Sequence, residues 1–266
     1  MHVLAEKPMT LTADGAFSLV AIAEQRNLQD RDDELLRSLI MTTFPPRVST
    51  NTTNLQAAID LGCVPMERTY DPMRDRLPYF GNQVVGTAVG SVHFANYSIA
   101  HVPGRWLNAL LSAEAAIGRP ADHDAIDTLA RWTYRAFEGP FALAKFIDPE
   151  TLTVLPKADL HNLREGLRAL LALVAHRGDE RARGLADANV DLVSRFFDDT
   201  TGKWNESAFS NSYPGETSFT CGPTFTFPVA FGRMIGPVIK CQRATGSEAA
   251  LALATRLVNL HSTTLS

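Results

Sequence analysis

The stretch that decides the fold is EGLRALLALVAHRG, Glu165–Gly178. Its apolar residues recur at the spacing of a helix, and the final glycine can adopt the left-handed conformation that ends one. Two other stretches share this layout: GRWLNALLSAEAAIG, Gly104–Gly118, and GRMIGPVIKCQRATG, Gly232–Gly246. The sequence therefore predicts three apolar helices, each of which ends at a glycine.

A second helix is predicted directly after each of these segments. The three partners are Asp124–Phe137, Asp179–Phe197 and Ser247–Leu260. In the last of them, apolar residues at helical spacing make one stripe, formed by Ala250, Leu253, Ala254, Leu257 and Val258. Each pair is a helical hairpin, and the unequal loops between pairs indicate a divergent array rather than a regular solenoid.

Helical hairpins of this size, with ends marked by Gly-Arg and by a glycine, resemble the alpha/alpha toroid of carbohydrate-active proteins. That group holds many glycoside hydrolases and polysaccharide lyases, and the resemblance covers about residues 70–262. It implies that the first helices line a concave wall, that their partners back them, and that a groove lies at one mouth. Three hairpins do not close a ring, so we expect a mainly α protein that forms a partial alpha/alpha toroid, from a chain that is a fragment of a longer one.

The N-terminus carries a different pattern. Glu6-Lys7-Pro8 follows a short apolar run, and a helix with an N-cap at Thr12–Asp14 comes next, which predicts a strand-helix appendage. Residues 2–28 resemble the glucose-fructose oxidoreductase and inositol dehydrogenase family at its EKP signature, in which the lysine lies near the nicotinamide and substrate. The chain contains no G-x-G-x-x-G turn to hold the pyrophosphate of a dinucleotide. Lys7 is therefore a cofactor-binding candidate only if the chain is an NAD(P)-dependent sugar oxidoreductase fragment.

These patterns divide the chain into three parts. Residues 1–28 are the oxidoreductase-like remnant, residues 29–69 a linker with short helices, and residues 70–266 the helical-hairpin domain. The linker contains FPPRVSTNTTN, Phe44–Asn54, which is rich in turn residues. A short helix is predicted after it, at Leu55–Leu61.

The first candidate site is SVHFANYSIAHVPGR, Ser91–Arg105, just before the first apolar helix. If this segment is partly helical, four of its polar side chains share one face: His93, Asn96, Tyr97 and His101. A lyase that acts on a uronic acid must neutralise the carboxylate and remove a carbon-bound proton. We assign Tyr97 and His101 as catalytic candidates. The substrate-binding candidates here are His93, Asn96 and Arg105, and the alternative is that the histidines cap helices and Tyr97 packs at the edge of the core.

The second candidate site is DDTTGKWNESAFSNSYPGETSFTCGPTFTF, Asp198–Phe227. Trp204 and Tyr213 are candidates for stacking on a sugar ring. Glu206 and Glu216 are the candidate acids of a hydrolase, which needs two carboxylates about 5 to 9.5 Å apart. We expect Asp198 and Asp199 to form an ordinary turn.

Two further groups have both a structural and a functional interpretation. Arg105 and Arg233 occupy equivalent positions in their hairpins, which favours pairing with an acidic residue of the neighbouring hairpin over substrate binding. Asp122 and Asp124 are next to His123, but neighbouring side chains at a helix start point apart, so a cap is favoured over a metal site. We expect no metal and no cofactor under the main hypothesis.

Composition limits the partners. The chain has 266 residues, a net charge of −4 and a hydrophobic share of 45%. The acidic balance and the lack of a basic run argue against nucleic acid, and no stretch of about 18 apolar residues predicts a membrane span. The N-terminus shows no secretory signal, which favours the cytoplasm. Cys63, Cys221 and Cys241 are odd in number and widely spaced, so free, packed thiols are expected.

The sequence thus predicts a carbohydrate-processing protein that acts on an oligo- or polysaccharide. Hydrolase and lyase both remain open, and the available carboxylates favour a hydrolase. The alternatives are the oxidoreductase fragment and a non-catalytic helical-repeat protein whose concave face binds a partner. Apolar helix faces exposed at an open ring would also promote self-association.

Overall fold

The structure is a computed structural model that describes residues 54–79, 81–83, 91–93, 101–158, 160–219 and 231–264. Residues Asn54–Ser266 form one compact unit. This unit begins inside the segment 29–69, which the sequence predicts as a linker with short helices. The predicted N-terminal strand and helix, with Lys7, lie outside the described residues.

Helices make up most of the described residues, which confirms a mainly α protein. They are α3 (Leu55–Arg68), α4 (His101–Ile117), α5 (His123–Ala136), α6 (Leu160–Arg177), α7 (Glu180–Phe196), α8 (Glu206–Ser212), the 3-10 helix η1 (Phe231–Met234), α9 (Ile235–Thr245) and α10 (Glu248–Thr264). The described strands are short: β1 (Tyr70–Asp71), β2 (Leu77–Pro78), β3 (Gly81–Gln83), β4 (Ser91–His93), β5 (Lys145–Ile147), β6 (Val154–Ala158), β7 (Phe197–Asp198), β8 (Lys203–Trp204) and β9 (Thr217–Phe219).

The three predicted hairpins are confirmed as α4–α5, α6–α7 and α9–α10. Each first helix ends at the predicted glycine, and Gly118, Gly178 and Gly246 have φ angles of 67°, 62° and 75°. Residues with a Cβ avoid this left-handed conformation, so glycine is the natural helix terminator here. A side chain caps each partner helix: Asp122 accepts a hydrogen bond from the N–H of Ala125, Asp179 accepts one from the N–H of Ala182, and the Ser247 hydroxyl accepts one from the N–H of Ala250.

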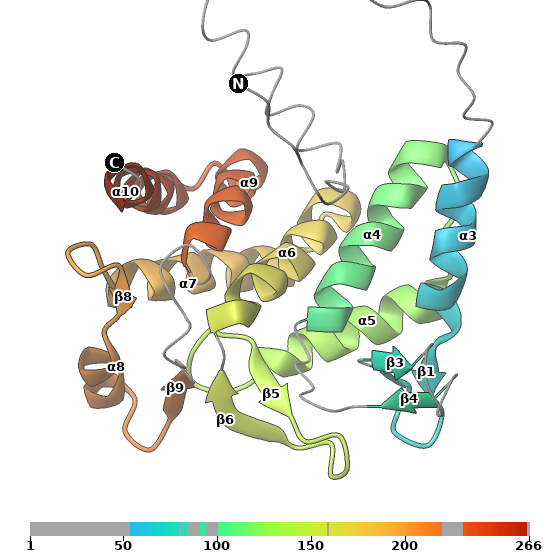
Figure 1. Ribbon diagram of the computed structural model, residues 1–266, viewed down its shortest axis with the longest axis horizontal. Helices are drawn as coiled ribbons and strands as arrows, with labels where there is room; N and C mark the ends of the chain where they lie inside the picture. The colour runs from blue at the N-terminus through green and yellow to red at the C-terminus, as the bar shows by residue number, and fades with distance from the viewer. Residues whose placement is uncertain are drawn as a thin grey trace, which may run out of the picture. The chain divides into compact units, whose positions relative to one another are not determined.

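The first helices lie side by side in chain order, and the helix after each one covers it (Figure 1). The helix α6 is in the middle, packed against α4 on one side and against α9 on the other. In the second layer, α5, α7 and α10 each pack against their own first helix, and α10 also contacts α7. The helices α4 and α6 are parallel, because their N-terminal ends meet at Arg105 and Glu165 and their C-terminal ends meet at Glu114 and Arg177. The helix α9 runs the same way, since Arg233 before it is within electrostatic reach of Glu165, and Lys240 further along it is within reach of His176.

The two helices α4 and α6 approach each other very closely near their N-terminal ends. A Cβ added at Gly104 would lie 2.4 Å from the backbone oxygen of Glu165. Two small residues further along α6, Ala169 and Ala172, are also buried. The contact therefore depends on residues without large side chains.

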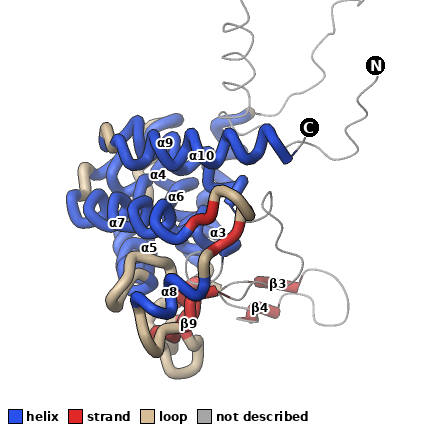
Figure 2. Tube along the Cα trace, turned by 90° about the vertical axis from the view of Figure 1, so that its left-hand side faces the viewer, coloured by secondary structure: helices blue, strands red, loops and turns tan. Residues whose placement is uncertain are grey.

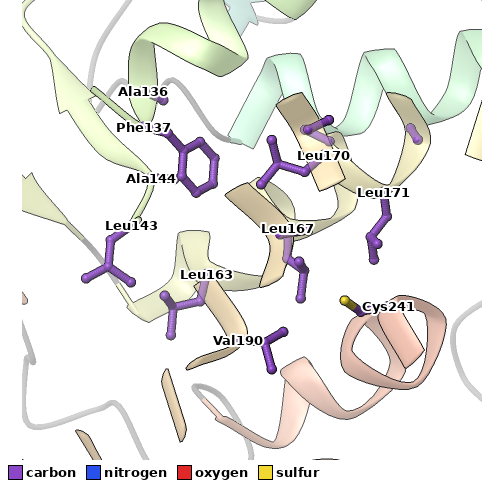
Figure 3. Close-up of a cluster of buried hydrophobic side chains, with 14 of the residues drawn as sticks. Ala136, Phe137, Leu143, Ala144, Leu163, Leu167, Leu170, Leu171, Val190 and Cys241 are labelled. Carbon is purple, nitrogen blue, oxygen red and sulfur yellow. The ribbon is translucent and has the colours of Figure 1, made fainter. Parts of the chain in front are cut away.

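The hydrophobic core surrounds α6. Figure 3 shows side chains of several helices gathered there, and its labelled residues include Leu163, Leu167 and Leu171 of α6, Val190 of α7 and Cys241 of α9. Cys63 and Cys241 are buried free thiols, as predicted, and Cys221 lies outside the described residues.

The helix α3 packs against α4 (Figure 1). This helix includes the predicted short helix at Leu55–Leu61 and continues to Arg68. Arg119, in the turn between α4 and α5, donates two hydrogen bonds of 2.6 Å to Glu67 of α3. This ion pair fixes α3 to the first hairpin.

Short strands lie near the N-terminal ends of the first helices (Figures 1 and 2). In the three-stranded sheet, β6 pairs with β5 in the antiparallel sense and with β9 in the parallel sense. The strand β6 leads directly into α6, and β9 precedes η1 along the chain. The N-terminal ends of α4, α6 and α9 lie at one end of the helical layer, which we call the N-terminal mouth.

Candidate functional site

The N-terminal mouth holds a cluster of arginine side chains around one buried carboxylate. Glu165 of α6 is 0% exposed, and its Oε1 accepts hydrogen bonds of 3.3 Å from Nε and Nη2 of Arg105 in α4. The same oxygen accepts hydrogen bonds from Nη2 of Arg164 and from its Nε, the latter at 2.9 Å. Arg105 thus pairs with an acidic residue of the neighbouring hairpin, as the sequence favours. The other oxygen of Glu165, Oε2, is buried with no hydrogen-bond partner among the described residues.

Charge keeps Glu165 ionised in spite of its burial. Burial by itself would raise the pKa of this carboxyl group, and it is the largest single effect. The hydrogen bond from Arg164 and the charges of Arg164 and Arg105 outweigh it, so the pKa lies below the usual value. Glu165 is therefore a fixed negative charge that orients the arginines around it.

Arg233, which enters α9 through η1, belongs to the same cluster. Its pKa is lowered, first by burial and then by the like charges of Arg164 and Arg105, while Glu165 acts in the opposite direction. These effects place Arg233 within electrostatic reach of the other cluster residues. The two equivalent arginines of the sequence repeat, Arg105 and Arg233, thus meet at one place.

The cluster carries excess positive charge that faces solvent. It contains three guanidinium groups and one carboxylate, and the side chain of Arg105 is 49% exposed. The positive ends of the helix dipoles of α4 and α6 point in the same direction. This arrangement can accept an anionic group from solvent.

A groove of about 330 Å³ lies between α4, α6 and α9, and its lining begins about one helical turn beyond Arg105 and Arg164. Two polar residues of α4, Asn108 and Ser112, line it. The remaining lining residues come from α6 and α9, and they are Arg168, Leu171, Ala172, Ala175, His176, Lys240, Arg243 and Ala244. The groove contains basic and small side chains and no carboxylate among these lining residues.

Among the lining residues, His176 is the group whose ordinary pKa lies nearest to pH 7. Burial lowers its pKa most, the charges of Arg177 and Lys240 lower it further, and Glu114 acts in the opposite direction. The imidazole is therefore neutral at pH 7, so the groove owes its positive charge to arginine and lysine.

The structure separates the residues of the first predicted site. His93 ends the strand β4, whereas His101 begins the helix α4, so the prediction of one helical face from His93 to His101 is wrong. Asn96 and Tyr97 lie outside the described residues. His101 is partly buried and lies four residues before Arg105, which places these two side chains on one face of α4.

In the second predicted site, the aromatic side chains pack against other aromatic residues of the hydrophobic core. Trp204 is only 7% exposed, and Phe196, Phe209 and Phe231 surround its ring. An indole covered in this way has no open face for a sugar. Tyr213 is partly buried against Phe209 at the end of α8.

The acidic residues of the second site have separate surroundings. Glu206 is exposed in the first turn of α8, where a negative charge stabilises the helix N-terminus. Asp198 accepts hydrogen bonds from the N–H groups of Thr200 and Thr201, which confirms the predicted turn. Glu216 precedes β9 and lines a pocket of about 280 Å³ with Glu138 and Lys145.

Lys145 is the residue of this pocket that the sequence prediction missed. It is 3% exposed, its Nζ donates a hydrogen bond to the backbone oxygen of Glu138, and it lies 4.1 Å from the centre of the Phe141 ring. Burial lowers the pKa of Lys145 most, and the charges of Glu216 and Glu138 oppose this effect. A single lysine inside the apolar run Ala142–Ile147 is the signal from which it might have been found.

Comparison with known proteins finds no matching family model, no similar curated protein and no similar solved structure. Within the described residues, no helix is both long and apolar enough to cross a bilayer. No group of three histidine, cysteine or acidic side chains in the described ranges is arranged to hold a metal ion.

Proposed function

We propose that this chain is the helical part of a carbohydrate-processing protein of the alpha/alpha-toroid type, which binds an oligo- or polysaccharide at the N-terminal mouth. The observation that carries the proposal is the order of the helices: α4, α6 and α9 lie parallel with α6 in the middle, and each is covered by the helix that follows it. A layer of this kind can curve into a partial toroid, and its mouth collects the segments that enter the first helices.

The proposed chemistry uses the residues that α4 presents at the mouth. Arg105 binds a substrate oxygen, and His101, one helical turn earlier, moves a proton. Tyr97, Asn96 and His93 precede this turn in the sequence and complete the candidate set. No cofactor takes part in this proposal.

Two bond-breaking reactions fit this assignment, and their products distinguish them. In elimination, a base removes the proton on the carbon next to a uronic carboxylate and the glycosidic C–O bond breaks, which leaves a carbon–carbon double bond. In hydrolysis, water adds across the glycosidic bond, for which Glu216 and Glu206 are the acidic candidates. Both reactions produce new reducing ends, and only elimination produces an ultraviolet-absorbing unsaturated sugar.

The experiment is to incubate the protein with neutral and acidic plant and algal polysaccharides and to measure both products. We expect cleavage of at least one polysaccharide and a large loss of rate in His101→Ala. His123→Ala is the matched control, because His123 also begins a helix, α5, and is exposed near Glu114, at the other end of α4 from His101. If no polysaccharide yields either product, the proposal is wrong.

A non-catalytic helical-repeat protein is the second candidate, and the burial of Trp204 favours it, because a sugar-cleaving site commonly offers an open aromatic ring. Such a protein would bind a partner on its concave face and cleave no polysaccharide, and His101→Ala would leave that binding unchanged. Self-association remains a prediction. The exposed side chains of Leu251 and Val258 on α10 are its best support.

A further inference from the structure

We infer that the groove on the face of α4, α6 and α9 binds a polysaccharide chain that carries carboxylate groups. This inference rests on the proposed function and adds the substrate class to it. The Arg105–Arg164–Arg233 cluster holds one end of the bound chain, and Lys240 and Arg243 hold the other.

The basic residues follow one face of the helical layer. On α6, Arg168 and His176 both line the groove, and Arg164 precedes Arg168 by four residues, one helical turn. The rise from Arg164 to His176 is about 18 Å, since an α-helix rises 1.5 Å per residue. A surface of this length can contact several consecutive sugar residues.

Acidic side chains on these helices are already neutralised. The helix α4 contains one carboxylate, Glu114, which accepts hydrogen bonds from Arg177 and from the N–H of Ala121. The helix α6 contains one, Glu165, which lies buried among arginines, and α9 contains none. The whole chain nevertheless has a net charge of −4, so positive charge is concentrated on this face. A positively charged surface on a chain whose net charge is negative indicates a binding site for an anionic ligand.

The lining residues identify the occupant. Among the described residues that line the groove none is aromatic, and the lining includes the small residues Ala172, Ala175 and Ala244. Proteins that bind single-stranded nucleic acid stack its bases on aromatic rings, and neutral sugars also rely on such rings. A carboxylated sugar chain instead gains charge-assisted hydrogen bonds from guanidinium groups, whose paired N–H donors match a carboxylate.

The test compares chains that differ only in charge. Binding is measured by calorimetry at physiological salt with polygalacturonate, alginate and hyaluronan, and with each of these chains after its carboxylates are converted to methyl esters. We expect at least one acidic chain to bind at least about tenfold more tightly than its ester, because the ester cannot form the ion pairs.

Matched variants locate the site. The triple variant Arg168→Gln, Lys240→Gln and Arg243→Gln removes three positive charges from the groove, and we expect it to lose at least about tenfold in affinity for the acidic chain. The control removes three exposed positive charges elsewhere: Arg131→Gln, Arg181→Gln and Lys203→Gln. This control should change the affinity less than about twofold, and thermal unfolding of both variants checks that they fold.

The outcomes are distinct. Equal binding of acidic chains and their esters, equal loss in the two triple variants, or tighter binding of single-stranded RNA would each overturn the inference. If a neutral polysaccharide is cleaved while charge has no effect, the inference fails and the proposed function stands. If no polysaccharide is bound or cleaved, both fail.

Discussion

Gly104 of α4 lies directly against the backbone of Glu165 in α6, and a Cβ at this glycine would come within 2.4 Å of the Glu165 carbonyl oxygen. The next residue, Arg105, forms the ion pair with the Glu165 side chain. Backbone contact and ion pair therefore occur at the same crossing point. The position of the arginine cluster depends on a glycine.

Gly104→Ala should destabilise the protein by about 2 kcal/mol, since the added methyl group must displace the backbone of α6. Chemical denaturation measures this change. Gly184→Ala in α7 is the control, because nothing lies within 4 Å of its Cβ position and alanine favours the helix by up to about 1 kcal/mol. Equal effects of the two substitutions would contradict the close contact.

Gly178→Ala should cost about 1 kcal/mol of stability, because alanine is strained at the left-handed φ of 62° that ends α6. The space around this glycine is open, so strain in the backbone is the sole cause. Replacement by asparagine, which tolerates this conformation better, should recover part of the loss in a thermal unfolding experiment. A stability that rises with alanine would show that α6 does not end there.

The ion pair between Glu114 and Arg177 predicts a pH-dependent contribution to stability. The hydrogen bond from Arg177 lowers the pKa of Glu114 most, to about 2, whereas an unfolded glutamate has a pKa of about 4.3. The stabilisation is therefore present above pH 4.3 and is lost as the pH falls toward 2. Glu114→Gln should be less stable than the unchanged protein by about 1 kcal/mol at pH 7, since the pair is partly exposed.

Denaturation between pH 3 and pH 7 tests this contribution. The difference between Glu114→Gln and the unchanged protein should shrink as the pH falls. Asp191→Asn, at an exposed position of α7, should show a small difference that depends little on pH. A constant difference for Glu114→Gln across the range would exclude an ionic cause.

Trp204→Ala should lower the free energy of unfolding by about 3 kcal/mol, because it leaves a cavity among Phe196, Phe209 and Phe231. Polysaccharide binding measured well below the unfolding temperature should not change. Loss of binding with full stability would instead restore Trp204 as a sugar-stacking residue.

The sequence predicts the hairpins well, because helix periodicity and a terminal glycine are local signals. Gly118, Gly178 and Gly246 all take the left-handed conformation that their position in the pattern requires. The expected pairing of Arg105 with a neighbouring hairpin is also confirmed. The partner, Glu165, is 60 residues further along the chain, and its identity depends on how α4 and α6 pack.

The candidate site is harder to predict for the same reason. Trp204 looks available in a polar stretch, yet residues from α7, α8 and η1 bury it. His93 looks helical when only spacing is considered, but pairing with Gly81 places it in a strand. The basic groove takes residues from three separate helices, and no single stretch of sequence contains more than half of its lining residues.

The parallel neighbours α4 and α6 are tied at both ends, by Arg105 with Glu165 and by Arg177 with Glu114. Sliding one helix past the other by a single turn would break both ties at once and would push Gly104 out of its contact. The spacing of the cationic groups is thus set before any ligand arrives. A ligand whose negative charges match this spacing binds without ordering the protein further, so little conformational entropy is lost. A ligand whose charges are spaced differently cannot move the helices to suit it.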